Sequence, residues 1–344
     1  MNDRALVPVE VRSLPHGAKL YHIRNNSRLT RIQAVMRTGS IHEGADAGCG
    51  LSHFLEHMLF QGCKRHPGNS ASDKIHALGG DCNAYTTFDH TAYYVEVPVE
   101  KFAEAADVIT SMVAEPTFPE EKFNSEKKVI EREADMIANR PNQVLIQNLW
   151  QELFPDHPAR FPIIGYGDKI AQVTRSDMVN YYQRRYGAMR SYWIVTGELD
   201  TDTVQNVLTE KLSNFARGNL QDIVMQPLPE QSFAIHTTAV FPDPLTRIVC
   251  GVRTPQASHC DAAALDLAAG ILGGSDSSLL PAELVYRREL ALMLSSEFDA
   301  MTFAGVMGIS AACEPRKQKQ LKSSIAAMLE KIRHTGITAE ALKR

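Results

Sequence analysis

The stretch HFLEH, residues 53–57, decides how the rest of the chain is interpreted. Apolar residues recur around it at helical spacing over 51–61, and a glycine follows at 62, which predicts a helix ending there. Residues at positions i, i+3 and i+4 share one face of a helix. We therefore expect His53, Glu56 and His57 to project together from this helix.

Two imidazoles one helical turn apart can both reach a single Zn²⁺ at about 2.0–2.1 Å. The order H-x-x-E-H is that of inverzincins. Zinc lowers the pKa of a bound water towards about 7. Glu56, which lies between His53 and His57, could then accept the water's proton and deliver it to the leaving amine. The plainer alternative is a surface helix whose histidines make ordinary hydrogen bonds.

A catalytic zinc needs a third protein ligand and an open position. The candidates lie in a second predicted helix, over 120–137. Seven residues make about two helical turns, so Glu126 and Glu133 share a face there. One could bind the metal while the other supports it, and the spacing does not choose between them. The alternative for this run is a solvated, charged helix.

The composition fits an ordinary soluble protein. The chain has 344 residues, which suggests two domains, with 44% hydrophobic and 22% charged residues. A net charge of −4 does not indicate binding to nucleic acid or to an anionic membrane. The six cysteines form no CxxC pair and suggest reduced thiols. Since neither a signal segment nor an apolar run of about 18 residues is seen, we expect a cytoplasmic protein without a membrane span.

The order of predicted elements suggests two related halves. We place a linker at 216–230 and the domains at 1–220 and 221–344. Both halves run strand, helix, Gly-Gly, strands, helix, and the segment 265–272 would match 51–59 without its histidines. The last residues, 340–344, fall in the middle of a helical pattern. We therefore expect the second domain to be truncated.

The run GLSHFLEHMLFQG, residues 50–62, resembles the pitrilysin/insulinase family, which includes the mitochondrial processing peptidases. Three further segments match that family in order: residues 79–91, 126–133 and 157–165. The resemblance covers most of 10–215 and, more faintly, 230–344. It implies an α+β fold of two related α/β-sandwich domains, each with a mixed or antiparallel sheet packed by helices. It also implies a homodimer, or a heterodimer with a related subunit, that closes a chamber.

The resemblance also assigns the carboxylates. Glu133 follows His57 by 76 residues and stands at the family's third-ligand position. One Zn²⁺ per chain would then be held by His53, His57 and Glu133. Glu56 is the implied catalytic base, and Glu126 is the implied supporting catalytic carboxylate beside the ligands.

The family binds peptide substrates by adding a strand to a sheet edge. Asn83, Ala84 and Tyr85 lie on the matching edge strand of this chain. Main-chain hydrogen bonds would fix the substrate there and would tolerate varied side chains. Without the resemblance, this segment is an ordinary hairpin strand.

One departure concerns the second domain, where family members carry an arginine and, seven residues later, a tyrosine. Arg287 matches the arginine that contacts the substrate, but the tyrosine position is Leu294 and the usual glycine is Ala291. An alignment shifted to Arg288 is the alternative. Loss of a donor to a developing oxyanion costs about 10²–10³ in rate. Some family members divide the zinc motif and the Arg/Tyr pair between two subunits.

These observations predict a zinc-dependent endopeptidase subunit that hydrolyses peptides or unfolded polypeptide segments. The alternative is a weakly active or non-catalytic scaffold subunit of a heteromeric peptidase. A purely structural zinc protein is disfavoured, because structural sites are closed, four-ligand and usually rich in cysteine.

Overall fold

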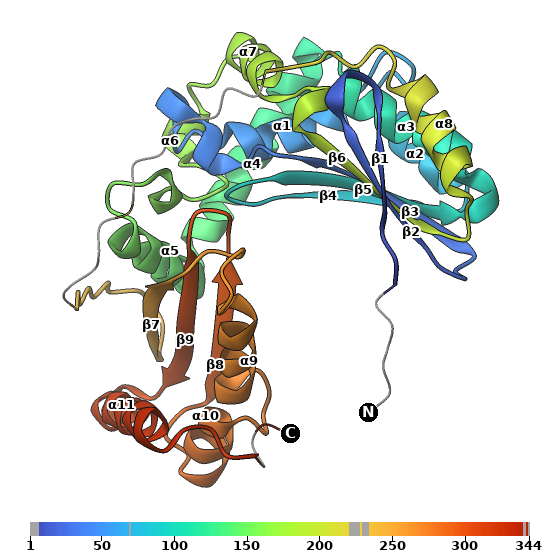
Figure 1. Ribbon diagram of the computed structural model, residues 1–344. Coiled ribbons are helices and arrows are strands. Elements are labelled where there is room, and N and C mark those ends of the chain that lie inside the picture. Colours follow the sequence, from blue (N-terminus) through green and yellow to red (C-terminus); the bar gives the residue numbers. More distant parts are fainter. Residues whose placement is uncertain (1–6, 69, 220–227, 229–233, 340–341, 343–344) are drawn as a thin grey trace. The chain divides into compact units, whose positions relative to one another are not determined.

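The computed structural model describes residues 7–68, 70–219, 228, 234–339 and 342 (Figure 1). The chain divides into two compact units. The first comprises residues 1–135 and 161–226, and the second comprises 136–160 and 227–344. The predicted linker at 216–230 lies mostly outside the described residues.

The first unit is built on a six-stranded mixed sheet in the order β1-β2-β6-β3-β5-β4. Only the β2–β6 pair is parallel among the described strands. The strand bounds are β1 Glu10–Ser13, β2 Lys19–Arg24, β3 Leu29–Met36, β4 Asp81–Thr86, β5 Thr91–Pro98 and β6 Ser191–Gly197. Strands β1 and β2 form an antiparallel hairpin around the turn at residues 15–17.

Helices cover one face of this sheet (Figure 1). Strand β3 shows why, because its residues alternate between buried and half-buried, and Ile32, Ala34 and Met36 are fully buried. That apolar face needs a helical layer to exclude water. The helices of the unit are α1 Leu51–Leu59, α2 Ser70–Ala77, α3 Phe102–Ala114, α4 Glu120–Ala138, α6 Gly167–Ile170, α7 Arg175–Arg185 and α8 Thr201–Lys211.

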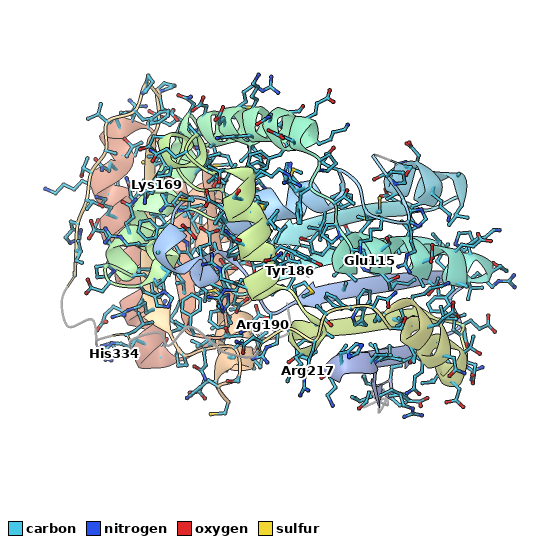
Figure 2. The ribbon with its side chains drawn as sticks, turned by 90° about the horizontal axis from the view of Figure 1, so that it is seen from above. Glu115, Lys169, Tyr186, Arg190, Arg217 and His334 are labelled. Atoms are coloured by element: carbon cyan, nitrogen blue, oxygen red, sulfur yellow. The ribbon has the colours of Figure 1, made fainter. Side chains whose placement is uncertain are left out.

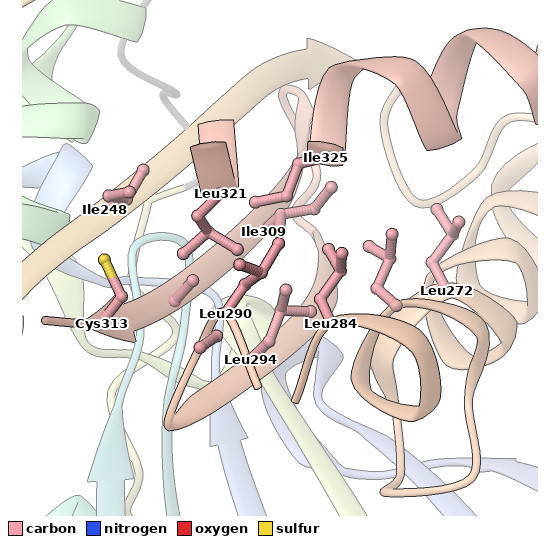
Figure 3. Close-up of a cluster of buried hydrophobic side chains, with 12 residues drawn as sticks. Ile248, Leu272, Leu284, Leu290, Leu294, Ile309, Cys313, Leu321 and Ile325 are labelled. Atoms are coloured by element: carbon pink, nitrogen blue, oxygen red, sulfur yellow. The ribbon is translucent and has the colours of Figure 1, made fainter. Parts of the chain in front are cut away.

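The second unit holds a three-stranded antiparallel sheet in the order β7-β9-β8. Its core is a cluster of mostly aliphatic side chains from the sheet and from the helical segments packed on it, among them Leu284, Leu294, Ile309 and Leu321 (Figure 3). The bounds are α5 Pro141–Leu153, β7 Thr246–Thr254, α9 Ala262–Gly273, α10 Leu279–Pro281, β8 Met293–Ala300, β9 Gly305–Cys313 and α11 Gln318–Thr335.

The helical segment over 278–288 is irregular. It consists of α10 and then η7, a π-helix over Ala282–Arg287, in which the Arg288 N–H donates to the Glu283 carbonyl at 3.0 Å.

Helix α5 belongs to the second unit, although the sequence assigned all of 1–220 to the first domain. The methyl groups of Leu149 on α5 lie against Gly251 of β7, where a side chain would leave too little room. A sequence pattern predicts that α5 is amphipathic, but it does not say which sheet α5 will cover. The α+β class and the sheets packed by helices are confirmed. Among the described residues, no helix is long and apolar enough to cross a membrane.

Candidate metal centre

Helix α1 begins at a close contact with the loop at 162–166. Gly50, directly before the helix, has φ +66°, and a Cβ there would lie 2.0 Å from the Ile164 carbonyl oxygen. Only glycine fits this backbone and this approach. The Tyr166 N–H donates to the Gly48 carbonyl at 2.9 Å. The start of the helix that carries both histidines is therefore fixed by its backbone neighbours.

A buried carboxyl group caps the same helix end. The Ser52 N–H donates to Glu43 Oε1 at 2.9 Å, and the Ser52 hydroxyl hydrogen-bonds the Tyr181 hydroxyl at 2.7 Å. Burial raises the pKa of Glu43 to about 8, against the opposing effect of N–H groups from Ser52 and Gly50. Glu43 thus satisfies N–H groups in the first turn that the helix itself leaves unpaired.

The loop after α1 is fixed by charge. Arg65 Nε lies 3.7 Å from Asp107 and 3.4 Å from Glu115, which Figure 2 labels. His66 Nε2 lies 3.0 Å from the Asp107 carboxylate. Both ends of α1 are therefore held by contacts from other elements.

Aromatic stacking brings α4 beside α1. The rings of Phe54 and Phe123 stack with centroids 4.8 Å apart and an interplanar angle of 19°, and both side chains are buried. Phe54 follows His53 directly, and Phe123 lies one turn before Glu126. The stack therefore places the carboxylate face of α4 next to the histidines of α1.

His53, His57 and Glu133 come together at this junction. One ligand atom from each lies within 4.8 Å of the other two, and His57 Nε2 is 3.9 Å from Glu133 Oε2. Ligand atoms on one tetrahedral zinc lie about 3.4 Å apart. Two imidazoles and one carboxylate are also a known ligand set of catalytic zinc. The residues present therefore fit a zinc ion.

Glu126 contacts the other nitrogen of the same imidazole. Its Oε2 lies 3.3 Å from His57 Nδ1. Because a carboxylate accepts a hydrogen bond, Nδ1 carries a proton, and Nε2 is the nitrogen that faces Glu133. A carboxylate on the far nitrogen orients a metal-binding imidazole and raises its basicity. The two glutamates that spacing alone left equivalent thus occupy different places.

The pKa values of the two imidazoles are shifted in opposite directions. Burial, together with the charge on His57, lowers the pKa of His53 to about 4, so that ring is neutral at pH 7. Burial also lowers the pKa of His57, but the hydrogen bond to Glu126 and the charges of Glu56, Glu126 and Glu133 outweigh it and raise the pKa overall. His53 hydrogen-bonds no described residue, which leaves its nitrogens available to a metal.

Glu56 is buried between the two histidines on α1. Burial raises its pKa, while a hydrogen bond from Thr86 and the nearby His57 oppose that change. The Thr86 hydroxyl donates to Glu56 Oε2 at 2.6 Å. A buried carboxylate with a raised pKa is suited to accept and return a proton.

Strand β4 forms one edge of the first sheet, and it pairs with β5 alone among the described residues. Asn83 and Tyr85 are exposed, and Ala84 is half-buried. The Ala84 N–H donates to Asn83 Oδ1 at 2.8 Å, and the Cys82 N–H donates to Asp81 Oδ1 at 2.9 Å. Side chains of the strand thus occupy two backbone donors. The edge is present where the family resemblance placed it.

The departure from the family pattern lies in the second unit. Leu294 is buried in the aliphatic cluster (Figure 3). Arg287 is exposed and forms a two-point ion pair with Glu283 one turn earlier. The side chain at position 294 therefore packs in the core of the second unit and carries no hydroxyl group.

Three contributors were not found from the sequence. Glu43 lies in a loop that carries no motif, and the Phe54–Phe123 stack joins residues 69 positions apart. Thr86 stands inside a matched segment, but no spacing rule links a strand hydroxyl to a helix carboxylate. Pairing of this kind depends on tertiary packing.

Comparisons with known proteins agree with this geometry. The chain is 29% identical over 302 residues to an uncharacterized zinc protease of Mycobacterium tuberculosis, covering 87% of this chain and 69% of that protein. It is 24% identical over 332 residues to the mitochondrial-processing peptidase subunit beta of Dictyostelium discoideum, covering 93% of this chain and 70% of that protein. These names support a metallopeptidase at the level of the family.

Solved structures share the fold. A protease from Helicobacter pylori matches with a TM-score of 0.91 at 23% identity, covering 98% of this chain and 83% of that chain. A peptidase M16 inactive domain from Pseudomonas fluorescens matches with a TM-score of 0.88 at 18% identity, covering 98% and 82%.

Two family models divide the chain between them. Residues 22–166 match the insulinase model of peptidase family M16, and residues 172–344 match the peptidase M16 inactive domain. The chain with the HFLEH helix therefore belongs to the insulinase family, peptidase family M16.

Proposed function

We propose that this chain is a zinc-dependent endopeptidase subunit that hydrolyses peptides or unfolded polypeptide segments. The observation that carries the proposal is the convergence of His53, His57 and Glu133, from two helices, beside the buried carboxylate of Glu56. One Zn²⁺ per chain is the proposed cofactor, and these three side chains are its proposed ligands.

Each residue has a separate role in this proposal. Zinc held there would lower the pKa of a water molecule and polarise a peptide carbonyl. Glu56 accepts the proton of the attacking water and returns it to the leaving amine. Glu126 holds the His57 imidazole through Nδ1, so that Nε2 keeps its direction towards the metal.

Substrate would be bound by strand addition along β4. Asn83, Ala84 and Tyr85 are the proposed contacts, because β4 has an edge open for pairing among the described residues. Arg287 is a further proposed contact. A substrate carbonyl would have to take the Ala84 N–H from the Asn83 side chain. Relatives named as a peptidase subunit support a paired assembly, either a homodimer or a heterodimer with a related chain. The cytoplasmic location stays a prediction.

The test separates chemistry from metal binding. Glu56→Gln keeps the shape of the side chain but removes the base, so peptide hydrolysis should fall about 10²–10⁴-fold while one zinc per chain is retained. Glu121→Gln, an exposed glutamate on α4, is the matched control and should hydrolyse at the wild-type rate. A chelator should abolish hydrolysis, and zinc should restore it. Full activity of Glu56→Gln would refute the proposal.

The second candidate is a scaffold subunit with little activity of its own. The burial of Leu294 favours it, because the family's tyrosine hydroxyl is missing at that position. A companion chain with the arginine and tyrosine pair would then be required. Zinc retention without hydrolysis, both alone and beside such a companion, would select the scaffold.

A further inference from the structure

We infer that Thr86 is a positioning residue for Glu56, and this inference rests on the proposed function. The hydroxyl at the end of the substrate-edge strand holds the proposed base in its working orientation. The inference connects β4, where a peptide would pair, to the carboxylate on α1.

The contact is short and specific. Thr86 is the last residue of β4, and its Oγ1 donates to Glu56 Oε2 at 2.6 Å. Hydrogen bonds from a hydroxyl to a carboxylate are about 2.5–2.7 Å long and roughly twice as strong as neutral ones. Both residues are at least partly shielded from water, which strengthens the interaction.

The geometry explains why a single hydroxyl matters. The terminal torsion of a glutamate has a broad energy minimum, so an unanchored carboxylate group turns about its axis. Anchoring Oε2 fixes the plane of the group, while Oε1 makes no hydrogen bond to a described residue. That oxygen remains available to take a proton from water.

The position of Thr86 on the strand adds a link to substrate binding. The N–H groups of Cys82 and Ala84 are bonded to side chains of β4 itself and not to β5. Backbone groups alternate sides along an antiparallel strand, so those of Thr86 face the same open edge. A peptide added there would pair directly beside the residue that holds Glu56. Thr86 therefore lies at the junction of the substrate edge and the base.

The experiment compares Thr86→Val with Thr86→Ser. Valine keeps the shape and removes the hydroxyl, so kcat should fall about 10- to 100-fold, while KM changes less than about threefold. Zinc stoichiometry and zinc affinity should match the wild type, because no ligand is altered. Thr86→Ser restores the donor and should recover most of the lost kcat. Wild-type kcat in Thr86→Val, or no recovery with serine, would overturn the inference.

A second readout does not depend on activity. In the metal-free protein, Thr86→Val should lower the unfolding temperature, but the same change in a Glu56→Ala background should have little effect, because the partner is already gone. Additive shifts would show that the hydroxyl does not hold the carboxylate and would overturn the inference. An inactive wild type with non-additive shifts would refute the proposed function but leave the contact itself supported.

Discussion

The two units of this chain share one arrangement of three strands, but only the first carries the proposed zinc ligands. In the first, β3, β5 and β4 lie side by side, and in the second, β7, β9 and β8 repeat that order with the same antiparallel pairing. A helix follows the first strand of each set: α1 with its two histidines, and α9 with none. The scaffold is repeated, but the proposed ligands are not.

The difference shows where chemistry enters the fold. Helix α9 packs on β8, and its segment 265–272 offers aliphatic side chains, glycine and one aspartate. Helix α1 buries an apolar face as well, but it also carries His53, Glu56 and His57 on the remaining face. A fold provides positions, and a site depends on which side chains occupy them.

The largest effect should come from removing a proposed ligand. His53→Ala takes away one of three donors, so zinc affinity should fall more than about 100-fold, beyond the 10- to 100-fold loss typical of residues that only orient a ligand. Zinc per chain can be measured by metal analysis after dialysis. His76→Ala on α2 removes an exposed histidine of the same unit and is the matched control. Equal zinc content in His53→Ala and wild type would contradict the proposal that α1, unlike α9, carries zinc ligands.

The next effect separates the two cores. Phe54→Ala removes one ring of the stack that joins α1 to α4. It should lower the free energy of unfolding by about 3–5 kcal/mol and should also weaken zinc binding. Leu284→Ala in the second unit should lower the free energy of unfolding by about 2–5 kcal/mol but leave the zinc affinity of the folded protein unchanged. Denaturant unfolding and zinc titration of each variant provide the comparison. Equal loss of zinc affinity in both would contradict a site built within the first unit alone.

A smaller effect concerns pH and Glu43. The folded chain keeps the proton of this carboxyl up to about pH 8, whereas the unfolded value is 4.5. Its contribution to the free energy of unfolding is therefore complete below pH 4.5 and is lost as pH rises towards 8. Glu43→Gln stays neutral, so its free energy of unfolding should rise relative to the wild type by roughly 1.4 kcal/mol per pH unit within this window. If the free energies of unfolding of the two proteins depend on pH in the same way, the pKa of Glu43 is not raised.

The second unit holds a buried group, His157, whose pKa is shifted in the direction opposite to that of Glu43. Burial lowers the pKa of His157 to about 4, and its ring stacks on Phe303 with centroids 4.5 Å apart. This neutral imidazole contributes stability that is lost as pH falls from 6.5 towards 4. Replacing Glu43 should therefore change the free energy of unfolding above pH 4.5 and leave the acid side of the curve, to which His157 contributes, as in the wild type.

Much of the local structure follows from the sequence. Helical spacing over 51–61 predicted an element close to the observed α1, because a period of 3.6 residues is imposed by the backbone itself. The π-helical turn over Ala282–Arg287 was not predicted, since an apolar pattern does not distinguish one helical hydrogen-bond pattern from another. The assignment of α5 was also missed, since an amphipathic helix does not specify its partner sheet.

By itself, the sequence determined that two imidazoles and one carboxylate share a face of one helix, since a helix fixes its own geometry over a single turn. It also supplied two acidic residues on a second helix without distinguishing them. Tertiary structure decided that Glu133 meets the histidines, that Glu126 lies against His57 Nδ1, and that Thr86 holds Glu56. These contacts span 30 to 80 residues, and only the packing of α1 on α4 and β4 brings such distant groups within a few ångströms.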